Sequence, residues 1–220
     1  MKSGVLFTVI LLLISCRSEH YKAGDGKYSY LRSDFVEAHT SAAGVFDYVV
    51  TDDGDTLSVQ PYMKISWAQT PDSLYRCLLY YNHVNGHAEP VSARSVPVVA
   101  CKNAADIDTV FMDKLTFESA WISRNRKYLN IGFWVKMGKS EKDGMTDCTQ
   151  RIGLVFDSIV NRTNGRKDMY LRIFHNQNGV PEYYSTKGYM SLPLQGTSAG
   201  TIIHLTANTY NGKVEKIVNY

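Results

Sequence analysis

The sequence lacks the features that mark disulfide scaffolds, zinc sites, nucleic-acid-binding proteins and long helices. Its four cysteines include no C-x-x-C pair and no Cys/His spacing of the kind that zinc sites use. The formal net charge is only +3, so no strong electrostatic attraction to nucleic acid is expected. Long helical patterns are missing, whereas tyrosine and β-branched residues are frequent, and this composition favours strands.

The N-terminus carries the most specific local signal. Lys2 is followed by an apolar run, Val5 to Ile14, which is too short for the ~20 residues that a membrane-spanning helix needs. A basic start, a short apolar segment and a small residue before the cut describe a secretory signal peptide. The sequence Leu13-Ile14-Ser15-Cys16 also resembles the lipobox of bacterial lipoproteins, in which the cysteine is lipidated and becomes the first mature residue. We therefore predict a signal peptide over residues 1–15 and a lipid on Cys16. The alternative is an ordinary signal peptide that happens to contain a cysteine.

Residues 16–26 are polar and contain glycine, which predicts a flexible tether. Arg17, rather than Asp, follows the lipidated cysteine, and this resembles the pattern that sorts lipoproteins to the outer membrane. We expect a protein of the bacterial cell envelope, held at the outer membrane by its N-terminal acyl chains.

Residues 27–103 alternate in polarity over five or six short segments. Asp52 to Asp55 and Asn85-Gly86 are hairpin signals, since Asp-Gly and Asn-Gly supply the positive φ angles of tight primed turns. The segment Ser73 to Asn82 is apolar on both faces at one end, which indicates burial on two sides. This pattern predicts a small closed barrel of the OB type, with a polar boundary at Lys102 to Asp106.

Residues 104–220 predict an antiparallel, immunoglobulin-like β-sandwich, because about seven segments of strand character are separated by regularly spaced turn signals. The expected fold is therefore all-β, with an OB-like barrel followed by a sandwich. The expected strands are Phe117 to Ser123, Tyr128 to Met137, Gln150 to Val160, Met169 to Asn176, Glu182 to Leu194, Gly200 to Tyr210 and Val214 to Val218.

Short motifs along the whole mature chain carry a family resemblance. They are Gly24 to Ala38, Glu118 to Ser123 with Tyr128 to Ile131, His175 to Gly179 with Pro181 to Lys187, and Ser191 to Leu194. These motifs resemble the NigD-like lipoproteins of anaerobic Gram-negative bacteria. The resemblance implies an OB-like domain and an immunoglobulin-like sandwich, and it implies no established biochemical activity. The family name carries a link to bacteriocin immunity.

Gly196 to Gly200 matches G-x-S-x-G, the nucleophile elbow of hydrolases. The elbow needs a helix after it, whereas the segment Thr201 to Thr209 is β-branched and alternating. His204 is the only later histidine, and no acid precedes it in the required order. We interpret this stretch as a turn and predict no catalytic residues.

Two further motifs suggest metal sites at first sight. His83 and His87 are four apart, but Asn-Gly between them favours a turn over the helix that would place both on one face. Asp52 to Asp55 gathers three carboxylates but lacks the spacing of an EF-hand loop, so a solvated hairpin is the better interpretation. We predict no metal and no cofactor.

The tyrosine pairs Tyr80-Tyr81 and Tyr183-Tyr184 offer rings for stacking on sugars, although neighbouring strand residues face opposite sides and one of each pair is expected in the core. Cys77 and Cys101 either pair in an oxidising envelope or remain as buried thiols, the state that we favour. The sequence as a whole predicts a non-enzymatic binding or interaction module whose partner is a glycan or an envelope protein. The alternative is an immunity or export factor for a bacteriocin-like peptide.

Overall fold

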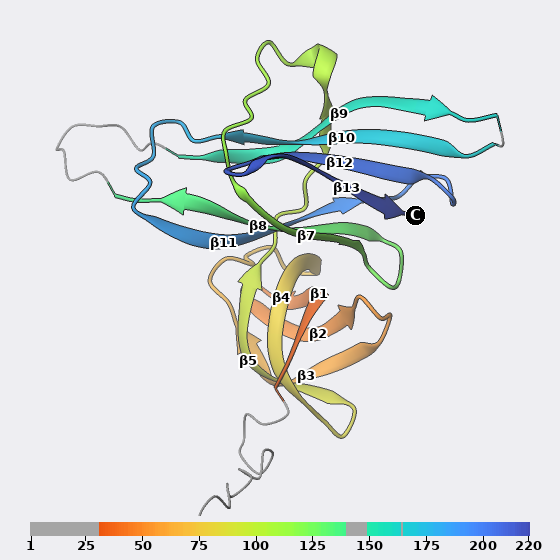
Figure 1. The fold of residues 1–220 in the computed structure, drawn as a ribbon. Helices are drawn as coiled ribbons and strands as arrows, with labels where there is room; N and C mark the ends of the chain where they lie inside the picture. Colours follow the sequence, from red (N-terminus) through yellow and green to blue (C-terminus); the bar gives the residue numbers. More distant parts are fainter. Residues whose placement is uncertain (1–30, 140–148, 164) are drawn as a thin grey trace, which may run out of the picture.

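The computed structural model describes residues 31–139, 149–163 and 165–220, and in these ranges the chain forms two all-β bodies stacked on each other (Figure 1). The all-β expectation is confirmed. The expected signal peptide, the tether, the lipidated Cys16 and Cys148 lie outside the described residues. No helix in the described ranges is both long enough and apolar enough to cross a membrane.

The first body is a closed five-stranded barrel in the order β1-β2-β3-β5-β4. Neighbours pair antiparallel except β3 and β5, which pair in parallel where the barrel closes. This arrangement confirms the expected OB-like barrel. Its strands are β1 (Leu31–Ala42), β2 (Val45–Thr51), β3 (Thr56–Lys64), β4 (Ser73–Val84) and β5 (His87–Ser95).

The barrel core is filled by side chains that alternate along the strands. Val36, Phe46, Val59, Cys77 and Leu79 are fully buried, and every second residue of β1 from Val36 to Thr40 points inward. Alternation with a period of two places one face of each strand in the core. Each large side chain buried in this way contributes roughly 1.5–3 kcal/mol by leaving water.

Two turns of the barrel test the hairpin predictions. Asn85 and Gly86 have φ angles of 47° and 80°, so the expected primed turn is confirmed. In the β2–β3 hairpin, by contrast, Gly54 alone has a positive φ, and Thr51 accepts a hydrogen bond from the Gly54 N–H at 2.9 Å. Four residues, Asp52 to Asp55, therefore separate the two strands, and only Gly54 among them is left-handed. β3 continues beyond Pro61 as far as Lys64.

The second body is a sandwich of a five-stranded sheet, in the order β13-β12-β10-β9-β6, and a three-stranded sheet, in the order β11-β8-β7. A short 3-10 helix, η2 (Ala104–Asp106), follows β6. The strands are β6 (Cys101–Asn103), β7 (Thr116–Ile122), β8 (Tyr128–Met137), β9 (Arg151–Asn161), β10 (Lys167–Asn176), β11 (Tyr184–Pro193), β12 (Ile202–Thr209) and β13 (Gly212–Asn219).

Two details of the sandwich differ from the sequence-based prediction. β6 pairs with β9, so residues 101–103 belong to the sandwich and the expected boundary after residue 103 lies too late. Three polar or small residues give too weak a pattern to reveal such a strand. The sheet is also not wholly antiparallel, since β10 pairs with β12 and β6 pairs with β9 in parallel.

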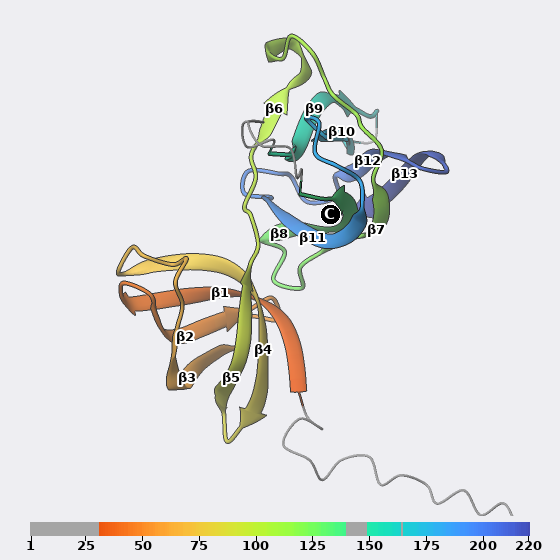
Figure 2. The ribbon, with the colours of Figure 1, turned by 90° about the vertical axis from the view of Figure 1, so that its left-hand side faces the viewer.

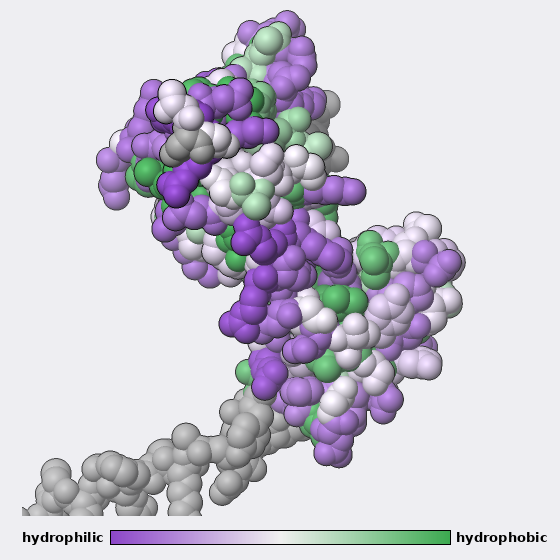
Figure 3. Space-filling model, turned by 90° about the vertical axis from the view of Figure 1, so that its right-hand side faces the viewer, coloured by the Kyte–Doolittle hydropathy of each residue, from purple (hydrophilic) through white to green (hydrophobic). Residues whose placement is uncertain are grey.

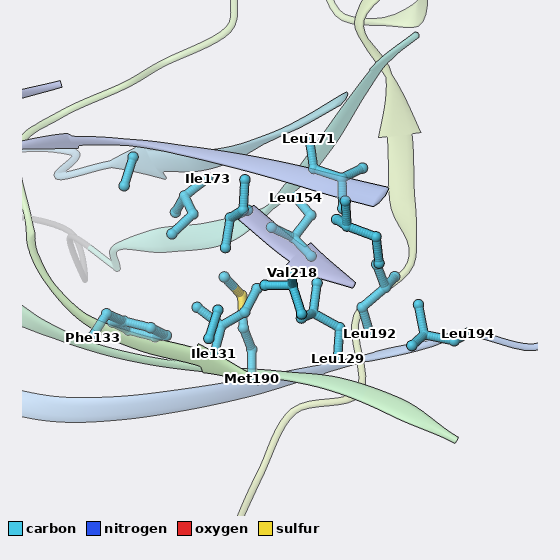
Figure 4. Packing of buried hydrophobic residues seen from close by; sticks show 14 of the residues in the cluster. Leu129, Ile131, Phe133, Leu154, Leu171, Ile173, Met190, Leu192, Leu194 and Val218 are labelled. Carbon is cyan, nitrogen blue, oxygen red and sulfur yellow. The ribbon is translucent and has the colours of Figure 1, made fainter. Parts of the chain in front are cut away.

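The sandwich core lies between the two sheets (Figure 4). Leu129, Ile131 and Phe133 of β8 point toward Leu171 and Ile173 of β10, and all five are buried. Gly188 of β11 lets the ring of Phe133 lie against its backbone, because a Cβ there would stand only 2.5 Å from that ring. Alternate residues of β8 therefore build one side of the core.

A buried polar network joins the two bodies. Arg76 of β4 donates to both carboxylate oxygens of Asp52, at 2.6 and 2.7 Å, and both residues belong to the barrel. The same guanidinium donates to Asn130 Oδ1 of β8 at 3.0 Å and to Ser191 Oγ of β11 at 3.3 Å. Arg76, Asn130 and Ser191 are all almost fully buried. We call these four residues the junction network.

The junction network is closed upon itself. Asn130 Nδ2 donates to Asp52 Oδ2 at 3.0 Å, and Ser191 Oγ donates to Asn130 Oδ1 at 2.7 Å. The Arg76 guanidinium also lies 4.3 Å from the centre of the Tyr128 ring, a cation–π contact. Since a buried charge is tolerated only when it is paired and hydrogen-bonded, this network fixes how the bodies meet.

Further contacts surround the junction network. Glu37 of β1 accepts hydrogen bonds from Lys127 Nζ at 2.7 Å and from the Tyr128 hydroxyl at 2.8 Å. Burial acts to raise the pKa of Glu37, but the hydrogen bonds from Lys127 and Tyr128 hold it below its ordinary value. The ring of Phe35 meets Trp121 and Tyr189 edge to face, with centroids 5.4 and 5.1 Å apart. The interface is thus ionic at its centre and aromatic beside it.

Arg76→Ala is expected to lower the free energy of unfolding by about 3–5 kcal/mol, because it leaves the Asp52 carboxylate without its buried partner. The matched control is Arg124→Ala, which breaks the exposed ion pair with Asp53, whose side chains are 79% and 54% exposed. The control should cost less than about 1 kcal/mol. Urea unfolding of both variants measures the difference, and equal losses would contradict the role of the junction network.

Cys77 and Cys101 are both unpaired thiols in the structure, as favoured from the sequence. Burial raises the pKa of Cys77 to about 12 and that of Cys101 to about 11, so neither forms the reactive thiolate near neutral pH. Cys77 should therefore resist iodoacetamide at pH 8 in the folded protein and react fully after unfolding. Peptide mapping by mass spectrometry checks this, and a Cys77–Cys101 disulfide peptide would contradict it.

Candidate functional site

The hydrolase-like stretch Gly196 to Gly200 forms the loop between β11 and β12. Its two glycines have positive φ angles of 84° and 81°, and a strand rather than a helix follows. Ser198 Oγ accepts a hydrogen bond from Lys167 Nζ at 3.1 Å, whereas His204 is bonded to Glu215 at 2.9 Å. The turn interpretation is confirmed.

The two motifs that suggested metal sites, His83 with His87 and Asp52 to Asp55, have other positions and contacts in the structure. His83 and His87 stand on opposite strands of the β4–β5 hairpin rather than on one helix face. The carboxylate of Asp52 is held by Arg76 and Asn130 at the junction, so the expectation of a wholly solvated Asp52 to Asp55 hairpin is wrong for that residue. Within the described part of the chain, no group of three or more His, Cys, Asp or Glu side chains is placed to hold a metal ion.

The tyrosine pairs separate as follows. Tyr81 is buried in the barrel and donates its hydroxyl to Asp34 at 2.7 Å, while Tyr80 faces outward, as expected for neighbours on a strand. Tyr183 and Tyr184 are 75% and 53% exposed, so neither is in the core and the expectation for this pair is wrong. The reason is local: Tyr183 precedes β11, outside the alternation of the strand.

A histidine cluster on the outer face of the barrel was not predicted. His39 Nδ1 lies 2.7 Å from Asp47 and Nε2 lies 3.1 Å from Asp72, and Tyr48 stacks on the imidazole at a centroid distance of 4.5 Å. A carboxylate at each ring nitrogen favours the doubly protonated imidazolium, and these hydrogen bonds raise the pKa of His39. His39 and Tyr48 face each other on the β1–β2 hairpin, but Asp72 lies 33 residues from His39, so no local pattern marks the cluster.

A hollow of about 810 Å³, which we call the groove, opens on the outer face of the sandwich between the chain at 99–111 and the start of β9. β6 covers β9 only at Leu154–Phe156, so Arg151, Ile152 and Gly153 remain along the groove. Figure 2 shows β6 beside β9 at the margin of the sandwich, with the chain after β6 arching over the top.

The groove has an apolar floor and a charged rim. Phe111 and Phe174 meet edge to face, with centroids 6.2 Å apart, and Phe111 is 42% exposed. Lys102, Arg151 and two aspartates, all exposed, form the rim. An apolar hollow with a few charged groups around it is the usual form of a binding site.

Residues 111–113, which we call the bridging segment, are held against β10 at the edge of the groove. His175 donates its N–H to the Phe111 carbonyl at 3.1 Å, and its own carbonyl accepts from the Asp113 N–H at 2.9 Å. His175 is fully buried, and the Asp113 carbonyl accepts from Nδ1 at 3.1 Å. The other ring nitrogen, Nε2, is buried with no hydrogen-bond partner among the described residues.

A second hollow of about 360 Å³ lies beyond the bridging segment, at the end of the sandwich where β10 and β12 finish. We call it the polar pocket. Its walls come from three stretches that are far apart in sequence, positions 112–114, 177–182 and 208–210, which is why no motif predicted it. They carry Asp113, Lys114, Gln177, Glu182, Asn208 and Tyr210.

Asp47→Asn should lower the pKa of His39 toward the ordinary histidine value near 6.5, because it replaces the anionic partner at Nδ1. Since the folded pKa is raised, the stability from protonated His39 is fully present below pH ~6.5 and is lost as pH rises through the folded pKa. An NMR titration of the imidazole measures the pKa of His39 in the wild type and in Asp47→Asn, with Asp53→Asn as a matched control at an exposed carboxylate. A wild-type midpoint at the ordinary value would contradict the prediction.

Comparison with known proteins bears on the whole chain. Residues 97–220, more than half of the sequence, match the family described as the NigD-like C-terminal beta sandwich domain. No curated protein matches the chain closely enough to count as a relative.

Three solved structures share the fold. A NigD-like immunity protein from Bacteroides caccae is 23% identical with a TM-score of 0.62, covering 84% of this chain and 91% of its own. A protein of unknown function from Bacteroides vulgatus is 18% identical with a TM-score of 0.62, covering 86% and 90%. A putative toxin-related protein from Parabacteroides distasonis is 17% identical with a TM-score of 0.58, covering 86% and 93%. These identities establish likeness of fold alone.

The family match begins at residue 97, immediately after the barrel ends at Ser95, and it contains both sheets of the sandwich. The motifs in residues 118–194 that resembled this family from the sequence lie inside the matched range. The chain belongs to the NigD-like family.

Proposed function

We propose that this protein is a non-enzymatic binding module carried at the bacterial cell envelope. The observation that supports it is the groove of about 810 Å³ on the sandwich. Its charged side chains stand on a solvent-exposed rim around an apolar floor, an arrangement suited to holding a partner. A nucleophile activated for catalysis would instead need a base within hydrogen-bond reach and a third group orienting that base.

The junction network supports this role by holding the two bodies in one orientation. A surface that does not reorganise on binding loses less conformational entropy when its partner arrives. Figure 3 shows one side of the molecule, on which hydrophilic residues predominate around the meeting of the two bodies and hydrophobic residues are scattered. That side is therefore an ordinary solvated surface, in contrast to the apolar floor of the groove.

The proposed location rests on the N-terminal sequence. Lipid on Cys16, the tether over residues 16–26 and Arg17 after the lipidated cysteine would hold the body at the outer membrane. A near-neutral charge favours a glycan or an envelope protein over nucleic acid as the partner.

Cys16→Ser is expected to move the protein from the membrane fraction to the soluble fraction, because it removes the acyl chains that hold the body to the bilayer. Cys77→Ser is the matched control, since its thiol is buried in the barrel and far from the anchor in sequence. Fractionation followed by immunoblotting measures the distribution. Persistence of the Cys16→Ser protein in the membrane fraction would contradict the anchor.

Gly153→Val tests whether the groove is the binding site. A Cβ on Gly153 meets nothing within 4 Å, so a side chain there should occupy the groove without straining the fold. The soluble body carrying Cys16→Ser should sediment with washed outer membranes of the same cells, and Gly153→Val should weaken this by about tenfold. Equal sedimentation of both proteins, or none of the unaltered body, would contradict the proposal.

Immunity to a peptide toxin is the second candidate function, favoured by the description of the Bacteroides caccae protein as an immunity protein. Deletion of the gene should then raise sensitivity to a bacteriocin-like peptide made by the same or a neighbouring strain. Unchanged sensitivity would count against this candidate and leave the binding role in place.

A further inference from the structure

We propose that the polar pocket is a carbohydrate-binding site that takes one or two sugar residues of a neutral glycan. This inference rests on the binding role proposed above. It names the class of ligand and a second binding site besides the groove. The pocket volume of about 360 Å³ suits a ligand of that size. Its walls combine carboxylates, amides, an ammonium group and a phenol ring, so both donors and acceptors face the hollow.

The two amides are held in a fixed orientation by the backbone. Gln177 Nε2 donates to the carbonyls of Val180 at 2.8 Å and Lys136 at 3.1 Å, and Asn208 Nδ2 donates to the Met112 carbonyl at 2.7 Å. A backbone carbonyl can only accept, so the amino group of each amide must face the protein. The amide oxygens are therefore available as preorganised acceptors for ligand hydroxyls.

The two carboxylates differ in how much of their capacity is used. Asp113 Oδ2 accepts from the Gln177 N–H at 2.7 Å, which holds the carboxylate in place beside the pocket. The Tyr210 hydroxyl lies 3.4 Å from Glu182 Oε2, which is longer than the 2.5–3.0 Å of an ordinary O–H···O hydrogen bond. A ligand hydroxyl can insert between Glu182 and Tyr210 at little cost, because the contact that it replaces is weak.

Tyr210 supplies the aromatic surface of the site. It is 41% exposed and lines the pocket, so part of its ring faces solvent. The apolar C–H faces of sugars pack on such rings while their hydroxyls bond to the polar groups around them. Tyr183 and Tyr184, which follow Glu182 directly and are largely exposed, offer further rings along the same margin for a longer glycan.

The charge of the walls disfavours an anionic ligand. Asp113 and Glu182 carry two negative charges and Lys114 one positive charge, so the walls sum to −1. An anionic ligand would meet two carboxylates, and a cationic ligand would meet the Lys114 ammonium. Hydroxyl groups, which both donate and accept, match this mixed set without a charge conflict.

A glycan array probed with the mature chain carrying Cys16→Ser is the test, followed by calorimetric titration of the best-bound glycan. Binding to a neutral glycan is expected. Tyr210→Ala and Glu182→Ala should each weaken it by about tenfold or more, whereas Tyr210→Phe, which keeps the ring, should weaken it only a few-fold. Tyr62→Ala, at a 66% exposed tyrosine on the barrel, is the matched control and should bind unchanged.

Three results would overturn the inference. They are no glycan bound, a loss of binding in Tyr62→Ala that equals the loss in Tyr210→Ala, or binding confined to amine-bearing ligands and abolished by the isosteric Glu182→Gln. Circular dichroism melts of each variant separate loss of binding from loss of fold. An empty array would remove the sugar site alone, since the binding role at the groove is decided by Gly153→Val and outer-membrane sedimentation.

Discussion

The structure depends on one buried ion pair that ties two separately folded cores together. Arg76 and Asp52 both belong to the barrel, yet the remaining hydrogen bonds of their charged groups are completed by Asn130 and Ser191 of the sandwich. Separating the bodies would remove the hydrogen bonds that Asn130 and Ser191 make with this ion pair. The linker reinforces this, since Val96 bonds to the Arg76 carbonyl and Val99 to the Ser191 carbonyl.

This constraint gives the two bodies different roles. The barrel has its largest polar cluster at the junction and a second one around His39, and both are internally paired. The sandwich carries both the groove and the polar pocket. Strands β9 and β10 and the chain at 99–111 line the groove, whereas connections form most of the walls of the polar pocket. In folds of this kind, loops on a rigid scaffold are where binding surfaces are usually found.

Strand positions could be predicted from the sequence because alternation records burial directly. Tyr128–Met137 was predicted to the residue, since it has a regular apolar face and is bounded by turn residues. β6 was missed because three residues carry no period, and the parallel pairing of β10 with β12 was missed because pairing partners leave no mark on a strand's own pattern. Burial of β4 on two sides was predicted, but not that Arg76 would occupy the second side.

The candidate sites could not be predicted for a related reason. The polar pocket gathers residues from positions 112–114, 177–182 and 208–210, and each stretch alone resembles an ordinary polar turn. The groove exists because β6 pairs with β9 only at residues 154–156 and leaves the start of β9 uncovered. Such pairing between distant segments is not visible in the sequence of either strand.

Calorimetry of the soluble body tests most directly whether the junction network makes the two cores one unit. The unaltered protein should show a single thermal transition whose calorimetric enthalpy equals its van't Hoff enthalpy. Neither core can unfold without exposing the Arg76–Asp52 ion pair and its partners. Two separate transitions in the unaltered protein, one for the barrel and one for the sandwich, would contradict it.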